Sequence, residues 1–205
     1  MNKCENKCDE EETKKEPPLD TKIEEMFTKK RIVFLSTQVD DTSATAIIKK
    51  LWYLESLDNK KPILLVINSP GGSVDSGLAI VDMIRMINSP VYTLVMGLAA
   101  SMGSILSISG AKGKCYALTL GRIMIHQPLI GGTIYGQATD LEIQAKEIVK
   151  TRELLVQMYV EKTGKTTHQI NESLNRDCWM SADEAKKYGL IDHVISSFKD
   201  IPEFE

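Results

Sequence analysis

Short apolar segments of strand length alternate with segments of helical periodicity along the first half of the chain, and this alternation constrains the fold more than any other feature. Residues 31–35, 63–67 and 91–96 are apolar runs that predict buried strands. Between them, apolar residues recur at helical spacing: Ala44, Ile47, Ile48, Leu51 and Leu54, behind a capping cluster at 41–43, and then Leu78, Val81, Met83, Ile84 and Ile87. Repeated strand–helix units predict an α/β fold with a parallel sheet and right-handed crossovers.

The chain reads as one domain with polar ends. A length of 205 residues is that of a single domain with a sizeable core. Residues 1–19 are rich in Lys and Glu and predict a flexible, charged N-terminal tail. A short helix is expected at about 20–29, the domain is expected to span 20–196, and 197–205 are expected to form a C-terminal tail.

Composition excludes several classes of function. A net charge of −3 without a basic patch argues against a nucleic-acid partner. No apolar run approaches the ~18 residues of a membrane span, and the N-terminal segment lacks the apolar core of a secretory signal. The four cysteines, Cys4, Cys8, Cys115 and Cys178, are scattered and have no second pair of zinc ligands. We therefore expect reduced thiols, a cytoplasmic location, no membrane partner, and neither a metal nor a cofactor.

Ser101 lies in a run of small residues that follows the apolar segment 91–96. Gly97, Ala99, Ala100 and Gly103 surround it, and a helix can continue to Ile108. These residues allow a tight strand-to-helix turn with the serine at the helix N-terminus. Free N–H groups there suit an activated nucleophile, but serine is also an ordinary N-cap residue without a chemical role.

A serine nucleophile needs a base, and the chain has three histidines. His168 lies in a polar stretch and reads as solvated, while His193 has no special context. His126 ends the apolar run 122–125 and precedes Gln127-Pro128, which predicts a strand end where functional loops gather. The same position is also typical of a buried, hydrogen-bonded histidine.

A second glycine segment, residues 68–74, lies between a predicted strand and a predicted helix. It reads Asn-Ser-Pro-Gly-Gly-Ser-Val and predicts a turn. Its bare backbone N–H groups can bind an oxyanion or the carbonyls of an extended peptide. A plain turn with nothing bound fits the same residues.

Five motifs occur in order along the chain. They are INSPGG at 67–72, MGLAASMG at 96–103, RIMIHQP at 122–128, GQATD at 136–140, and the segment 176–192 with its Arg-Asp, Met-Ser-Ala and Tyr-Gly-Leu-Ile-Asp elements. Together they resemble the proteolytic subunits of the Clp protease family, serine peptidases that work with an unfoldase ATPase. The resemblance covers about 20–196 and implies a catalytic domain built as a crotonase-like ββα spiral, an α/β fold with a protruding handle helix.

The resemblance also implies site residues, matched position by position. Ser101 is the nucleophile, His126 the general base, and Asp177 the acid that orients His126. The backbone N–H groups of Gly72 and Met102 form the oxyanion hole. Substrate-binding residues follow from the same motifs: Gly71, Gly72, Ser73, Val74, Pro128, Leu129 and Ile130. The substrates implied are polypeptides.

The segment from Thr139 to Lys162 contains neither Pro nor Gly and predicts a long helix. It opens on a possible capping box at 139–142 and carries one apolar stripe, Leu141, Ala145, Ile148, Leu155 and Tyr159. An ordinary surface helix and an arm against another subunit both fit this pattern. The resemblance makes residues 131–163 the handle that joins two heptameric rings into a tetradecamer, with Gly131-Gly132 as an edge strand for extended substrate.

Several residues depart from the family's pattern. The loop at 128–136 is two residues longer than the commonest form, Asn175 stands where many members carry an acid, and Cys178-Trp179 replaces a polar–Phe pair. The family's docking pocket for an AAA+ unfoldase ATPase falls on Trp52, Val66 and Met86. These departures favour a specialised subunit that assembles with a second, paralogous proteolytic subunit.

Three other functions are alternatives to a serine peptidase. An acyl-CoA enzyme of the crotonase type would use backbone N–H groups without a nucleophilic serine, and the ordered Ser101, His126 and Asp177 oppose it. A Ser–Lys peptidase needs a lysine base near the serine, and none is evident. An inactive ring subunit that serves as a scaffold stays open, because the three triad side chains can be misaligned.

Overall fold

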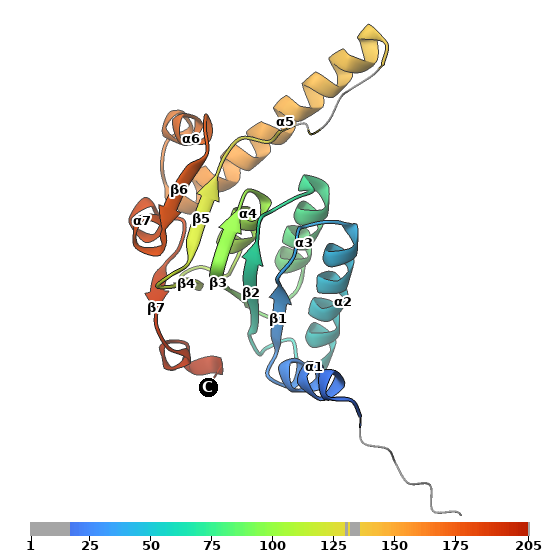
Figure 1. Ribbon diagram of the computed structural model, residues 1–205, viewed down its shortest axis with the longest axis vertical. Helices are drawn as coiled ribbons and strands as arrows, with labels where there is room; N and C mark the ends of the chain where they lie inside the picture. The colour runs from blue at the N-terminus through green and yellow to red at the C-terminus, as the bar shows by residue number, and fades with distance from the viewer. Residues whose placement is uncertain (1–16, 130, 132–135, 205) are drawn as a thin grey trace, which may run out of the picture.

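The computed structural model describes residues 17–129, 131 and 136–204. The described residues form one seven-stranded sheet with helices packed on it (Figure 1). Its strands are β1 (Ile32–Leu35), β2 (Ile63–Ser69), β3 (Val91–Ala100), β4 (Cys115–Leu118), β5 (Arg122–Ile125), β6 (Cys178–Ser181) and β7 (His193–Ile195). Its helices are α1 (Leu19–Lys29), α2 (Asp41–Leu57), α3 (Val74–Met86), α4 (Met102–Ile108), α5 (Ala138–Thr163), α6 (Thr167–Leu174) and α7 (Ala182–Tyr188). The predicted α/β fold class is confirmed.

The sheet is parallel except at one edge. Its main order is β1-β2-β3-β4-β7, with β5 parallel to β3 and β6 antiparallel to β5. The strand β3 is long and changes partner along its length. Residues 93–95 pair with β4, whereas 98–100 pair with β5. Because of this change of partner, the end of β3 lies beside the end of β5. The apolar run 91–96 predicted a shorter strand and gave no sign of the second pairing.

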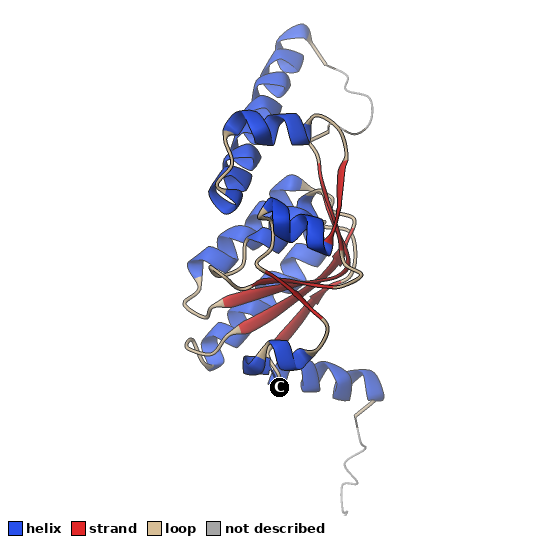
Figure 2. Cartoon of the chain, turned by 90° about the vertical axis from the view of Figure 1, so that its left-hand side faces the viewer, coloured by secondary structure: helices blue, strands red, loops and turns tan. Residues whose placement is uncertain are grey.

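Both faces of the central strands are buried, as expected for parallel strands with near-continuous apolar sequence. Odd-numbered β2 residues face the helices α2, α3 and α4, where Leu65 contributes to the larger core cluster. Even-numbered β2 residues, such as Leu64, face a second cluster on the other side. Figure 2 shows most helices on one side of the strands, which are drawn in red, and the short C-terminal helices, at the label C, on the other side.

The C-terminal residues pack rather than form the expected tail. Two short 3-10 helices, Phe198–Asp200 and Pro202–Phe204, fold back onto the second cluster. Ile201 is fully buried, and the ring of Phe204 packs edge-on against Tyr92 at 5.6 Å. Burial of these apolar side chains favours the packed form. At the other end, Leu19 belongs to α1 rather than to the tail, and residues 1–16 lie outside the described part.

The termini of the predicted elements shift by a few residues. Arg31 precedes β1 instead of opening it, because its backbone is left-handed with φ 57°. Asp40, not the cluster at 41–43, is the N-cap of α2, and Ser43 completes its capping box. Gln137 is the N-cap of α5, where its N–H donates to Asp140, so the cap lies two residues before the expected one.

The helix α5 is 26 residues long and extends away from the sheet (Figure 1). Only its C-terminal half joins the core, where Leu155 and Tyr159 are buried. In the outer half, Leu141 is 40% exposed and Ile143 is 60% exposed. The single predicted stripe therefore divides into a buried part and an exposed part. Gly131 lies outside any strand, and Gly132 lies outside the described residues.

Glu55 of α2 fixes the loop that leads into β3. One carboxylate oxygen accepts hydrogen bonds from the backbone and side-chain nitrogens of Asn88, at 3.0 Å each, and the other accepts from the N–H of Ser89 at 2.9 Å. Desolvation alone would raise the pKa of Glu55, but these donors together outweigh it and lower the pKa to about 2. The ionised carboxylate therefore stabilises the native state.

Glu55→Gln is expected to lower the free energy of unfolding by about 0.5–1 kcal/mol at pH 7, because an amide nitrogen replaces one acceptor and solvent screens the remaining interaction. A depressed native pKa gives stability that is present above the unfolded value, 4.5, and is lost as pH falls toward about 2. Urea denaturation should thus show a smaller gap between wild type and variant at pH 3.5 than at pH 7. The exposed Glu153→Gln serves as control, and a gap that widens on acidification would contradict the assignment.

Candidate active site

Strand register brings two sequence-predicted residues to the same end of the sheet. Ala100 pairs with Met124 on the parallel strand β5, and the N–H of Ser101 donates to the Met124 carbonyl at 2.9 Å. His126 follows β5 directly. The two side chains meet there, with His126 Nε2 2.7 Å from Ser101 Oγ.

Asp177 arrives from the antiparallel partner of β5. Ile125 pairs with Cys178, so the residue before β6 lies beside the residue after β5. Asp177 Oδ1 is 3.4 Å from His126 Nδ1. The His126 side chain is 16% exposed and that of Asp177 is 60% exposed, so the carboxylate approaches from the solvent side. The structure therefore brings Ser101, His126 and Asp177 together from three separate elements.

Ser101 occupies an uncommon backbone conformation. It is the single residue between β3 and α4, with φ 54° and ψ −122°. A residue with a Cβ atom adopts positive φ only where its surroundings impose it, at a cost of about 1–3 kcal/mol. Its hydroxyl accepts no hydrogen bond from the N–H groups of α4. Ser101 therefore occupies the N-cap position of α4, as the alternative expected, but its hydroxyl does not cap the helix and lies 2.7 Å from His126 Nε2 instead.

The Pro-Gly-Gly turn lies directly against Ser101. A Cβ atom on Gly71 would lie 2.5 Å from the Ala100 carbonyl oxygen and 2.7 Å from Ser101 Cβ. A Cβ atom on Gly72 would lie within 2.2 Å of the Val39 carbonyl oxygen. Both glycines have positive φ, 89° and 148°. Only glycine permits these close approaches without displacing backbone.

Two backbone N–H groups are left available beside Ser101. The segment at Val39 pairs with the glycine turn through Val39 N to Gly71 O and Ser73 N to Val39 O, both 2.8 Å, which leaves the Gly72 N–H outside the pair. Met102 is the first residue of α4, so its N–H has no acceptor within the helix. Neither group donates to another described residue.

The remaining predicted substrate-binding residues surround this turn. Ser73 is the N-cap of α3, where its hydroxyl accepts from Ser76 N–H, and Val74 is the first helical residue. Pro128 and Leu129 follow His126 in a coil segment, and Leu129 is 74% exposed. Ile130 lies outside the described residues.

The three residues predicted for partner docking do not share one surface. Trp52 on α2 and Met86 on α3 are 60% and 61% exposed. Val66 is only 2% exposed, in the second core cluster on the opposite face of the sheet. The prediction of a buried strand at 63–67 already implied that Val66 is covered, whereas the match by spacing did not take burial into account.

Two supporting residues of the site were not predicted. Ser69 is fully buried, and its hydroxyl donates to the Thr37 carbonyl at 2.6 Å while it accepts from Gly71 N–H at 3.1 Å. Val39 pairs with Gly72 as described above. Ser69 stands within the INSPGG motif and could have been singled out, but an isolated valine gives no signal of this role.

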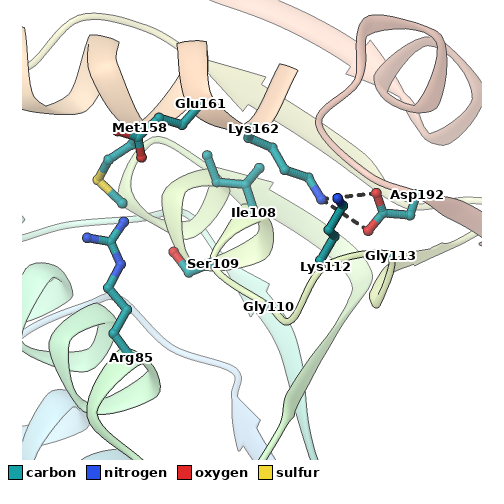
Figure 3. Close-up of a pocket in the computed structure, with 10 residues that line it drawn as sticks. All are labelled: Arg85, Ile108, Ser109, Gly110, Lys112, Gly113, Met158, Glu161, Lys162 and Asp192. Atoms are coloured by element: carbon teal, nitrogen blue, oxygen red, sulfur yellow. Dashed lines mark hydrogen bonds and ion pairs between the residues drawn. The ribbon is translucent and has the colours of Figure 1, made fainter. Parts of the chain in front are cut away.

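The site lies apart from a pocket whose lining includes none of Ser101, His126 and Asp177. That cavity, about 630 Å³, lies between the end of α4 and the inner half of α5 (Figure 3). Met158 and Lys162 line it from α5, and Ile108 lines it from α4. The described residues contain no group of three or more side chains suited to a metal ion, and none of their helices has the length and apolarity to cross a membrane.

An α/β sheet whose strand ends gather a serine, a histidine and an aspartate beside a glycine turn is the arrangement of a serine hydrolase. Comparison with known proteins identifies the family within this class of hydrolases. The family model for Clp protease matches residues 15–198, and the chain belongs to the Clp protease family, as its motifs indicated.

Individual relatives agree with the family match. The chain is 58% identical over 180 residues to the ATP-dependent Clp protease proteolytic subunit 1 of Protochlamydia amoebophila, covering 88% of this chain and 87% of that protein. It is 54% identical to the protein of the same name from Chlamydia abortus, covering 87% and 93%. It is 51% identical to the ATP-dependent Clp protease proteolytic subunit 2 of Prochlorococcus marinus, covering 81% of each chain.

Proposed function

We propose that this chain is the serine endopeptidase subunit of a self-compartmentalised, ATP-dependent protease in the cytoplasm. It cleaves unfolded polypeptides that an AAA+ unfoldase ATPase delivers, and it cleaves short peptides without the ATPase. The observation that carries the proposal is the 2.7 Å contact between Ser101 Oγ and His126 Nε2, with Asp177 at 3.4 Å from the other ring nitrogen. This is the geometry of a nucleophile and its base.

In the proposed reaction, Ser101 Oγ attacks the scissile carbonyl while His126 Nε2 takes the hydroxyl proton. His126 then gives this proton to the leaving amine, and the resulting acyl-enzyme is hydrolysed by water through the same base. Asp177 holds the imidazole in the orientation that presents Nε2 to Ser101. The N–H groups of Gly72 and Met102 stabilise the charge on the carbonyl oxygen, and loss of one such donor typically slows a reaction by ~100-fold or more.

Substrate would bind as an extended strand along the glycine turn. Main-chain hydrogen bonds with residues 71–74 on one side and 128–130 on the other do not depend on side chains. Such binding tolerates many sequences, as cleavage of unfolded chains requires. The exposed Leu129 is suited to contact a substrate side chain.

Assembly is proposed to use the outer half of α5. This half exposes three apolar side chains, Leu141, Ile143 and Val149. None of them belongs to either core cluster of the described residues. Burial against a second copy would remove them from water. Two heptameric rings joined in this way form a tetradecamer, and the exposed Trp52 and Met86 are suited to dock the ATPase.

A second candidate is a specialised subunit that becomes active only with a paralogous proteolytic subunit. Two observations favour it: the relatives bear the numbers 1 and 2 in their names, and Asn175 cannot form the ion pair that an acid would form at that position. Asn175 is exposed, its N–H donates to the Glu172 carbonyl at 3.3 Å, and its carbonyl accepts from the Gln127 side chain at 3.4 Å, so the hydrogen bonds it makes to described residues use its backbone.

The test is to treat the purified chain with a fluorophosphonate probe, locate the modified residue by mass spectrometry, and measure cleavage of a short fluorogenic peptide. We expect a single phosphonylated residue, Ser101, in a particle of heptameric size or larger. Peptide cleavage that arises only after a paralogous subunit is added would favour the second candidate. A monomer that is neither labelled nor active under both conditions would contradict both.

A further inference from the structure

Two buried hydroxyl groups connect the handle helix to the nucleophile. Tyr159 on α5 and Ser104 on α4 are 2% and 0% exposed, and their side-chain oxygens are 2.6 Å apart. The Ser104 hydroxyl also lies 2.6 Å from the carbonyl oxygen of Ser101. The sequence pattern predicted Tyr159 only as an apolar member of the α5 stripe and gave Ser104 no role.

The direction of these hydrogen bonds follows from the number of protons. A carbonyl oxygen only accepts, so Ser104 donates its single hydroxyl proton to Ser101. Tyr159 must then donate to Ser104. Burial raises the pKa of Tyr159, so its hydroxyl keeps this proton at ordinary pH. A chain of donors thus runs from Tyr159 through Ser104 to Ser101.

The acceptor at the end of this chain is half of a peptide group whose other half is the Met102 N–H. Because the peptide bond is planar, fixing the direction of the Ser101 carbonyl also fixes the direction of that N–H. A hydrogen bond to the carbonyl also polarises the group and strengthens its N–H as a donor. The same carbonyl oxygen also accepts from the backbone N–H groups of Ser104 at 2.9 Å and Ile105 at 3.4 Å, so the Ser104 hydroxyl adds a side-chain donor to those of the first turn of α4.

We propose that Tyr159 and Ser104 are positioning residues, which orient the Ser101–Met102 peptide so that the Met102 N–H points to the oxyanion. The inference rests on the proposed function, because it concerns the oxyanion hole of the same site. The position of the handle helix α5 against α4 therefore affects the rate of the chemical step.

The packing around the pair supports a specific role for it. A pocket opens between the C-terminal end of α4 and the inner half of α5, where Ile108 and Met158 line it (Figure 3). Ser109 of α4 and Met158 of α5 line its walls. Apolar side chains of both helices share the larger core cluster, and among the described residues the Ser104–Tyr159 contact is the one side-chain hydrogen bond between α4 and α5.

The experiment measures kcat and KM for a short fluorogenic peptide, and the rate constant for fluorophosphonate labelling, in the full-length assembled protein. Tyr159→Phe removes one hydroxyl and little volume. We expect kcat and the labelling rate to fall about 3- to 10-fold, with KM unchanged, because the interaction acts on the transition state. Ser104→Ala should show at least the same loss, and the double variant should be no slower than Ser104→Ala alone.

The matched control is Tyr188→Phe, since Tyr188 donates to Ser173 at 2.7 Å in a tyrosine–serine pair that makes no hydrogen bond to Ser101 or Ser104. Its kcat should stay at the wild-type value. Full kcat in Tyr159→Phe, an equal loss in Tyr188→Phe, or additive losses in the double variant would each overturn the inference while the proposed function stands. Should Tyr159→Phe fail to fold, Ser104→Ala decides by the same criteria. A wild-type protein that is not labelled at Ser101 overturns both.

Discussion

Ser101→Ala is expected to abolish cleavage of a short fluorogenic peptide and all labelling by a fluorophosphonate probe. Without the hydroxyl there is no nucleophile for His126 to activate, and the loss of kcat should reach about 10⁴-fold or more. The backbone N–H groups of Gly72 and Met102 remain, so weak binding of peptide should persist. Alanine tolerates the backbone of Ser101 about as well as serine does, so folding and assembly should be preserved, as measured by thermal unfolding and sedimentation.

The matched control for this variant is Ser109→Ala, at the end of the same helix. The Ser109 hydroxyl donates to the Ile105 carbonyl at 2.7 Å and does not reach Ser101. Its removal should leave peptide cleavage unchanged. Labelling of Ser101→Ala at the wild-type level would show that the nucleophile is another residue.

Much of the architecture could be predicted because its causes are local. Apolar runs and helical spacing mark the central strands and their helices, and the parallel sheet follows from their alternation. The contact of Ser101 with His126 depends instead on the change of partner of β3 between residues 95 and 98. The residues of β3 alone do not reveal this change, because it involves strands that lie far apart in the sequence. Motifs in a known order supplied that long-range information.

What could not be predicted depends on the direction of individual side chains. Spacing from the glycine motif assigns Val66 to the docking pocket, but Val66 belongs to the apolar run 63–67 that predicts a buried strand, and it lies in the second core cluster. Tyr159 fits an apolar stripe, yet its hydroxyl makes a specific bond to Ser104. Periodicity assigns a residue to a face of an element, but not to the partner that its polar atom contacts.

Gly71→Ala is the substitution expected to damage the site most without removing a reacting group. The added Cβ atom would meet the Ala100 carbonyl oxygen at 2.5 Å and the Met102 nitrogen at 2.9 Å, and backbone atoms cannot turn aside as a flexible side chain can. The turn or the nucleophile must therefore move, and a shift of ~1 Å can cost about 100-fold in rate. We expect kcat/KM for a short peptide to fall at least about 100-fold and the free energy of unfolding to fall by about 2–4 kcal/mol.

The control separates this clash from the strain of positive φ alone. Gly113 has φ 74°, close to the 89° of Gly71, but a Cβ atom there would meet no other atom within 4 Å. Gly113→Ala should therefore lose only about 1–2 kcal/mol of stability and keep its activity. Because the two variants share the conformational penalty, the difference between their kcat/KM values measures how closely the glycine turn is fitted to Ser101. Equal activity of the two would mean that the turn can move away from Ser101 without cost, and that Gly72 is not held in place as an oxyanion donor.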